Sequence, residues 1–295
     1  MATDFSITDY GGRVRSVLIV TLVLNCAVAF AKIFYGNAIN SIAVSSDGFH
    51  SLFDGVSNVI GLLGIWIASH PPDKEHPYGH RKFETLFTII IAAMIFLTCL
   101  EILKRVYGSL FDHHKTLVTE TSFMLMLATT AVNIFVMTYE ARKGRQLGSE
   151  FLVADAMHTK SDIFVSVSVI AGLFFTKLGY AYADTIVGLV IVFFIARIGY
   201  LIVKEASGIL VDTVCLDNSA IMRVVNGIAG VRGCHDIRTR GSVNSVYLDF
   251  HVLVDRKMPI EKAHGIADTV ENNIRKAFPA VVDIVVHIEP DERER

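Results

Sequence analysis

The chain has 295 residues, of which 52% are hydrophobic and 19% are charged, and its mean hydropathy is +0.49. This composition is too apolar for an ordinary soluble protein of that length and indicates a membrane protein. A net charge of −2 gives no reason to expect nucleic-acid binding, and four scattered cysteines without a CxxC pair predict neither a disulfide framework nor a zinc–thiolate site.

Six segments are long enough to cross a bilayer, for which a helix needs about 20 apolar residues. They are 14–35, 39–69, 83–107, 119–140, 151–176 and 181–204. The first lacks a small-residue cleavage site, so we interpret it as a retained span and not as a signal peptide. We therefore expect an N-terminal segment over 1–13, a transmembrane transport domain over 14–208 and a separate C-terminal domain over 209–295.

The basic residues of the connections are unevenly divided between the two sides. One side carries Arg13, Arg15, Lys74, Arg81, Lys82, Arg142, Lys143, Arg145 and Lys204, and the other carries Lys104, Arg105, Lys115 and Lys177. The richer side is expected to face the cytoplasm. Both termini are then cytoplasmic, and the protein is expected in the cell membrane.

The second predicted span contains the stretch SSDGFHSLFD, with Asp47, His50 and Asp54 in otherwise apolar surroundings. A charged side chain at the centre of a spanning helix costs about 2.5 to 3.5 kcal/mol on insertion scales. Ionisable residues kept at such a cost indicate a functional site.

The same Asp-x2-His-x3-Asp pattern recurs in the fifth span as Asp155, His158 and Asp162. Residues i and i+4 lie on one helix face, so each His–Asp pair points at one spot. If the two spans meet, His50, Asp54, His158 and Asp162 form a set of two nitrogens and two oxygens that suits tetrahedral zinc. The alternative is that these are separate polar spots in helix packing, and the repeat at identical spacing favours the metal site.

The first aspartate of each repeat, Asp47 and Asp155, shares the face of its histidine. Three roles are open for this pair: to orient the imidazoles as hydrogen-bond acceptors, to cap polar backbone, or to line the entry path. Direct ligation is not expected.

From about residue 210 the pattern changes to that of a small soluble domain. VNSVYLDFHVLVD and VVDIVVHIE alternate like strands, and PIEKAHGIADTVENNIRKAF has helical spacing with Pro259 in its first turn. NSAIMRVVNGIAG predicts a helix that begins at Asp217 or Asn218 and ends at Gly230. The expected fold is an α-helical membrane domain of six spans followed by an αββαβ domain, ferredoxin-like or metallochaperone-like, with two helices on one face of a small sheet.

Together with the loop DKEHPYGHRK and the histidine-bearing tail, the HxxxD motifs on spans two and five resemble the cation diffusion facilitator transporters, from about residue 14 to Pro290. The resemblance implies a homodimer that exports divalent metal from the cytoplasm in exchange for protons. His50, Asp54, His158 and Asp162 are then the transport site.

Histidine in both pairs resembles the zinc-preferring pattern of the family. The resemblance therefore implies Zn²⁺ as the main substrate and Cd²⁺ as a second one, and the alternative is an exporter of Fe²⁺, Mn²⁺ or Co²⁺. Zn²⁺ is then substrate and regulatory ligand, and no organic cofactor is implied. The lack of a long His-rich loop between spans four and five favours a bacterial plasma-membrane exporter.

The resemblance also implies sites outside the membrane. Asp73, His76 and His80 match a loop metal site, in which Glu75 is a possible substitute for Asp73. The tail residues matching a binuclear metal site are His235, His251, His264, His287 and Glu289, with Cys234 as a possible extra ligand that we expect to be buried. The side chains of His287 and Glu289 share one strand face.

Lys82 and Asp212 resemble a salt bridge that ties the membrane domain to the tail, and it contributes to stability only if it is buried. His113 and His114 are expected to be solvated loop residues.

Two rival functions remain. An intramembrane zinc enzyme needs an open coordination position and a base, as in HExxH, and no HExxH is present. A passive channel would hold metal too long at a dehydrated site of four ligands.

Overall fold

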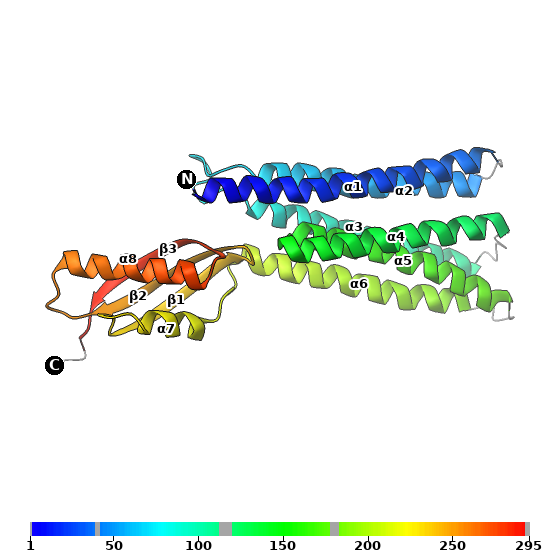
Figure 1. Ribbon diagram of the computed structural model, residues 1–295. Coiled ribbons are helices and arrows are strands. Elements are labelled where there is room, and N and C mark those ends of the chain that lie inside the picture. The colour runs from blue at the N-terminus through cyan, green and yellow to red at the C-terminus, as the bar shows by residue number, and fades with distance from the viewer. Residues whose placement is uncertain (1, 39–41, 112–119, 178–182, 293–295) are drawn as a thin grey trace. The chain divides into compact units, whose positions relative to one another are not determined.

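The computed structural model describes residues 2–38, 42–111, 120–177 and 183–292 (Figure 1). Six long helices occupy the described part of the chain up to residue 210. They are α1 (Ala2–Ala38), α2 (Ile42–Ala68), α3 (Lys82–Phe111), α4 (Glu120–Leu147), α5 (Glu150–Lys177) and α6 (Ala183–Leu210). Each coincides with one predicted span, and α1 extends further toward the N-terminus than the span at 14–35.

Within the described residues, three stretches are long and apolar enough to cross a membrane: Tyr10–Tyr35, Lys82–Gly108 and Ile186–Leu210. Gly55–Ala68 is a shorter apolar helix. Large apolar side chains such as Phe34, Leu97 and Phe193 are 80%, 64% and 66% exposed. Helices with apolar outer surfaces are stable in lipid, where water does not penalise that exposure.

The chain divides into a first unit, Met1–Ala206, and a second unit, Ser207–Arg295. In the first unit α1 packs on α2 and α4, while α5 packs on α3 and α4. Helix α5 also approaches α2 closely, because a Cβ atom at Gly61 would collide with the ring of Phe151. This contact brings together the two helices that carry the repeated motif.

A buried hydrogen-bond network fixes the start of α5. Ser149 caps the helix by accepting the backbone N–H of Leu152 at 3.3 Å, and its hydroxyl donates to Glu84 of α3 at 2.5 Å. Tyr10 of α1 donates to the same carboxylate at 2.8 Å. Because three helices meet at Glu84, the depth of His158 and Asp162 relative to α1 and α3 is set at this point.

The second unit consists of α7 (Asn218–Asn226), β1 (Gly233–Ser242), β2 (Ser245–Val254), α8 (Ile260–Ala277) and β3 (Val281–Pro290). The sheet order is β1-β2-β3, with β1 antiparallel and β3 parallel to β2. The predicted αββαβ order and the two-part fold class are confirmed.

Alternation along β2 separates the two faces of this sheet. Val246, Leu248, Phe250, Val252 and Val254 are buried in a core shared with α7 and α8. Tyr247, Asp249 and His251 alternate with them and are partly exposed on the other face. We call the face that carries these three residues the open face of the sheet.

The structure moves one boundary of each tail helix from its predicted place. Asp217 caps α7 by accepting the N–H of Ser219 at 3.0 Å, as expected, but the helix ends at Asn226 with Gly227 as its C-cap, and not at Gly230. Asn and Gly are poor helix formers, so the pair ends the helix one turn early. Pro259 is the N-cap of α8 and therefore precedes its first turn.

Candidate metal sites

The first repeat lies on α2, whose backbone includes Asp47, His50 and Asp54. The side chains of these three residues lie outside the described part of the structure. Their place on the helix is therefore observed, whereas their contacts stay a prediction.

The second repeat places His158 inside the first unit, where it is only 4% exposed. Among the described residues, neither ring nitrogen of His158 has a hydrogen-bond partner. Buried polar groups almost always have partners, so an imidazole without one is a candidate metal ligand.

A small polar cavity lies beside His158. It is lined by Asn25 and Val28 of α1, Ser51 and Ser57 of α2, Asn133 of α4, and His158, Thr159 and Asp162 of α5. His158 and Asp162 therefore share one space, as their i, i+4 spacing requires. An imidazole nitrogen and a carboxylate in a polar cavity are suited to binding a divalent metal.

Asp155 does not orient His158 through a hydrogen bond. Its Oδ2 atom accepts the side-chain N–H of Asn58 on α2 at 2.9 Å, and Asp155 is 1% exposed. Asp155 therefore does not orient the imidazole as a hydrogen-bond acceptor, which was the first of its three open roles. Its side chain faces α2, whereas the imidazole of His158 faces the cavity.

Lys32 of α1 is a residue that the sequence reading missed. It is 6% exposed, and its ammonium donates to the Ser51 hydroxyl at 2.8 Å. The available signal was a single lysine within the first apolar span, and intramembrane ionisable residues are functional candidates by default. Since Ser51 lines the cavity, Lys32 places a positive charge beside a space that also contains a carboxylate.

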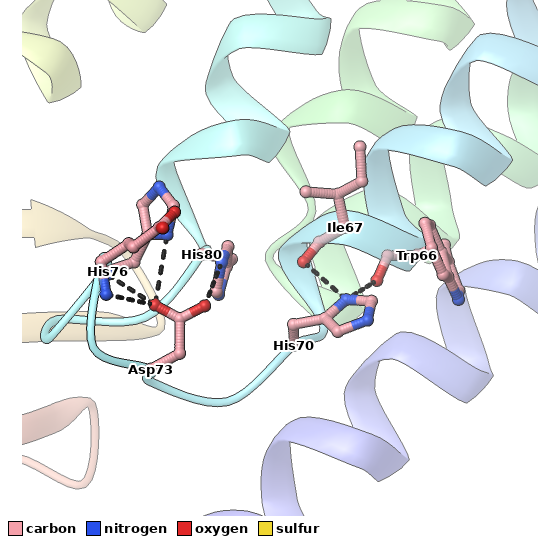
Figure 2. A network of polar contacts seen from close by, with 7 residues as sticks. Trp66, Ile67, His70, Asp73, His76 and His80 are labelled. Atoms are coloured by element: carbon pink, nitrogen blue, oxygen red, sulfur yellow. Dashed lines mark hydrogen bonds and ion pairs between the residues drawn. The ribbon is translucent and has the colours of Figure 1, made fainter.

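The loop between α2 and α3 brings its three predicted ligands together (Figure 2). Asp73 Oδ1 lies 3.3 Å from His76 Nδ1, and Asp73 Oδ2 lies 3.5 Å from His80 Nε2. Gly79 has φ +82°, a conformation that favours glycine, and it turns the chain so that His80 returns to Asp73. One ligand atom from each residue lies within 4.8 Å of the others, as a shared ion would require.

Backbone donors hold the loop carboxylate in place. The N–H of His76 donates to Asp73 Oδ1 at 2.6 Å and that of Glu75 at 2.9 Å. These bonds, the one from His76 first, lower the pKa of Asp73 below its ordinary value. Glu75 thus supports Asp73 through its backbone N–H, and its role as a substitute ligand stays a prediction. His70, which the sequence reading passed over, caps the end of α2 through the carbonyl of Trp66 at 2.8 Å.

Three tail histidines form a row across the open face of the sheet. His235 of β1 is paired with His251 of β2, which is paired with His287 of β3. Their ring centroids are 5.1 Å apart for the first pair and 4.8 Å for the second. A bulge at Asp236, with φ +50°, shifts the register after His235 and places the Asp236 carboxylate 3.5 Å from its ring.

Glu289 connects this row. Its carboxylate lies 3.0 Å from His235, 2.9 Å from His251 and 3.7 Å from His287. The contact with His251 is close in distance but is not in hydrogen-bond geometry. Imidazole and carboxylate groups are both zinc ligands in proteins, so three imidazoles around one carboxylate suit a metal bound at the surface of the sheet.

Two other tail residues lie apart from the row. His264 is on α8, with a side chain 78% exposed, and its described ion-pair partner is Asp268 at 3.8 Å. Because α8 covers the core face, His264 lies away from the open face of its own sheet. Cys234 packs against the core, and burial raises the pKa of its thiol.

The remaining predicted residues are not placed together. Lys82 belongs to the first unit and Asp212 to the second, so their salt bridge stays a prediction. His113 and His114 lie outside the described residues.

Comparison with known proteins identifies the family. Residues 18–211 match the cation efflux transmembrane domain, and residues 216–291 match the cytoplasmic domain of cation efflux proteins. This chain belongs to the cation efflux family. It is thus a multi-pass membrane protein that transports metal cations, and the predicted resemblance is confirmed.

The chain is 31% identical to an uncharacterized transporter of Methanocaldococcus jannaschii, over 92% of this chain and 99% of that protein. It is 29% identical to the manganese efflux system protein MneS of Bacillus subtilis, over 95% and 97%. It is 26% identical to the cation-efflux pump FieF of Klebsiella pneumoniae, over 96% and 94%.

A solved MamM-CTD chain is similar over 25% of this chain and 92% of its own length, with 24% identity and a TM-score of 0.24, so this likeness carries no further weight. Family membership makes divalent metal ions and a second copy of the chain the partners of this protein. The alternative of a membrane zinc enzyme is wrong.

Proposed function

We propose that this protein is a proton-coupled antiporter that exports divalent metal from the cytoplasm, with Zn²⁺ as its main substrate and Cd²⁺ as a second. The metal is bound inside the membrane by His50, Asp54, His158 and Asp162 and passes by alternating access. Both termini are cytoplasmic in this proposal, and the protein works as a homodimer in the cell membrane.

The observation that carries the proposal is the state of His158. It is a buried imidazole whose two nitrogens lack protein partners within the described residues, and it lines a polar cavity together with Asp162. The close approach of α2 and α5 at Gly61 and Phe151 supports the second half of the ligand set, because α2 carries the matching His50 and Asp54.

Proton coupling follows from the ligand chemistry. Metal binds neutral imidazole, and a protonated imidazole releases it. The ordinary histidine pKa of about 6.5 lies within the range over which cells vary pH. An acidic exterior therefore favours unloading on that side, and a more neutral cytoplasm favours loading.

Manganese is the second candidate substrate. MneS, which matches over nearly the full length of both chains, is named a manganese efflux protein. Mn²⁺ prefers oxygen ligands, whereas two imidazoles favour zinc, and this difference in ligand preference supports zinc as the first choice.

The loop site of Asp73, His76 and His80 and the tail row of His235, His251, His287 and Glu289 are proposed as additional metal sites. The tail senses cytoplasmic metal, and binding there tightens the dimer by mass action. His264, which is separate within one chain, remains a proposed tail ligand only if a second copy supplies the rest of the site.

The test is transport by the purified full-length chain in liposomes under an imposed proton gradient. Zinc should move against its gradient, and an ionophore that collapses the proton gradient should stop this movement. Manganese offered in competition should displace zinc poorly. Zinc movement that is indifferent to the ionophore would contradict proton coupling, and preferred uptake of manganese would make manganese the main substrate.

A further inference from the structure

Glu140 of α4 is a buried carboxylate that the proposed transport site does not use. It is 1% exposed, and among the described residues neither of its oxygens has a hydrogen-bond partner in good geometry. Glu84 is a useful contrast, because it is 6% exposed but accepts hydrogen bonds from Tyr10 and Ser149. Burial of a charged carboxylate without a partner is costly, so Glu140 is expected to hold either a proton or a cation.

A second buried carboxylate lies beside Glu140. Asp155 of α5 is 1% exposed and is close enough that the two negative charges repel each other. Asn58 donates to Asp155 at 2.9 Å and to the hydroxyl of Thr21 at 3.2 Å, and both Asn58 and Thr21 border Glu140. In the described part of the chain, no lysine or arginine pairs with either carboxylate.

Two neighbouring carboxylates in a low-dielectric interior do not both stay ionised unless a cation or a proton accompanies them. A shared proton would join them by a hydrogen bond, and within the described residues the Glu140 oxygens have no partner in good hydrogen-bond geometry, although Thr21 and Asn58 lie beside them. A bound cation would satisfy the Glu140 oxygens and offset both charges at once.

Hydrogen bonds connect this pair to the transport cavity. Asn25, which lines the cavity with His158 and Asp162, donates to Asn58 Oδ1 at 2.9 Å, and Asn58 in turn donates to Asp155. Glu140 lies two turns before the end of α4, and Asp155 lies within two turns of the start of α5. At about 1.5 Å per residue, Asp155 is therefore about 10 Å nearer to the α4–α5 connection than Asp162.

We propose that Glu140 and Asp155 form a second intramembrane site for a divalent cation, which the metal occupies between the α4–α5 connection and the cavity of His158 and Asp162. Thr21 supplies a third oxygen. A site made only of oxygen donors suits Mn²⁺ better than the imidazole-containing cavity does. The inference rests on the proposed function only for the cargo and its path, and the site itself stands on the contacts of Glu140.

The experiment counts Mn²⁺ ions bound per chain by the purified full-length protein in detergent, using equilibrium dialysis and the Mn²⁺ paramagnetic resonance signal. Glu140→Gln and, as a second variant, Asp155→Asn should each lose about one bound ion. Glu271→Gln is the control, because it alters a carboxylate of α8 that already has an ion-pair partner, Arg275 at 3.5 Å, and it should retain the count of the parent.

Asp162→Asn is the parallel arm and should lose a different ion, so that Glu140→Gln combined with Asp162→Asn loses about two. A retained count in Asp162→Asn alone would contradict the proposed transport site while leaving the Glu140 site intact. If both Glu140→Gln and Asp155→Asn bind as many ions as the parent, the pair carries a proton and the proposal is wrong. A loss in Glu271→Gln of the same size would also overturn it.

Discussion

The histidines of the two units differ in what surrounds them. His158 in the membrane unit is 4% exposed and, within the described residues, has no hydrogen-bond partner. The row on the open face of the tail sheet is partly exposed, and Glu289 lies within 3.7 Å of all three of its imidazoles. Both groups are candidate metal ligands, but only His158 has two buried ring nitrogens without a hydrogen-bond partner among the described residues.

This difference separates the proposed transport site from the proposed sensing site. In the membrane unit, a metal bound at His158 would contact polar atoms that are otherwise buried without partners, so loss of a ligand from this site should have a large effect on transport. In the tail, water and Glu289 already stabilise the imidazoles, so a metal must displace them and its net contribution is smaller.

The largest expected effect comes from Asp162→Ala. Loss of a charged ligand from the buried site should reduce zinc transport in liposomes by at least about 100-fold, since even indirect support of a ligand contributes about 10- to 100-fold. The exposed carboxylate of Asp268 provides the matched variant Asp268→Ala, with transport near that of the parent. Near-parental transport by Asp162→Ala, at equal expression, would favour the polar-packing alternative.

A second variant, His158→Asp, tests the ligand type of the membrane site, because it replaces an imidazole with a carboxylate and keeps a metal ligand in place. Replacing the imidazole with a carboxylate makes the site harder, so the preference for zinc over manganese should fall by about 10-fold while transport persists. The proton dependence should also move to lower pH, because the ordinary carboxyl pKa is about 3.9 and that of imidazole about 6.5. Competitive uptake in the same liposomes measures both. An unchanged preference in an active variant would place selectivity outside the ligand set.

Zinc binding at the tail should change the thermal stability of the protein, and variants of the tail should affect transport less than variants of the membrane site. Zinc bound at the tail row should increase the free energy of unfolding by about 2.7 kcal/mol at 100 times Kd, and so raise the melting temperature of the full-length protein. Glu289→Gln should abolish most of this shift, whereas His264→Ala, which alters an exposed histidine away from the row, should keep it. An equal loss in both variants would show that His264 completes the site, in agreement with a ligand shared between two copies.

The smallest effect is expected from the loop. Asp73→Ala should weaken metal binding there and lower transport by less than about threefold, because the loop site is partly exposed and lies outside the buried site. The pKa of Asp73 is already lowered by the backbone N–H of His76, so its carboxylate stays ionised as the pH falls. Imidazole ligands release metal when they are protonated, so metal should leave the loop at a higher pH than that at which a carboxylate is protonated. Isothermal titration at several pH values measures this, and release only near pH 4, about the ordinary Asp value, would contradict it.

Local patterns were sufficient to predict the elements of this protein. The six apolar runs became α1 to α6, and alternation in VNSVYLDFHVLVD and VVDIVVHIE became β2 and β3. The repeated Asp-x2-His-x3-Asp motif identified two helix faces because residues i and i+4 are neighbours in any helix. The end of α7 was misplaced by one turn because Asn226 and Gly227 were not recognised as a stop signal.

The partners of each polar side chain were decided only by tertiary structure. That Asp155 bonds Asn58 and not His158, that Glu140 is buried without a partner, and that His264 is on the other side of the sheet from His251 all depend on which helix and sheet faces meet. Residues 97 positions apart, Asn58 and Asp155, come into hydrogen-bond contact through packing of α2 against α5. Sequence spacing defines directions along one element, whereas burial and pairing arise from contacts between elements, which no local pattern encodes.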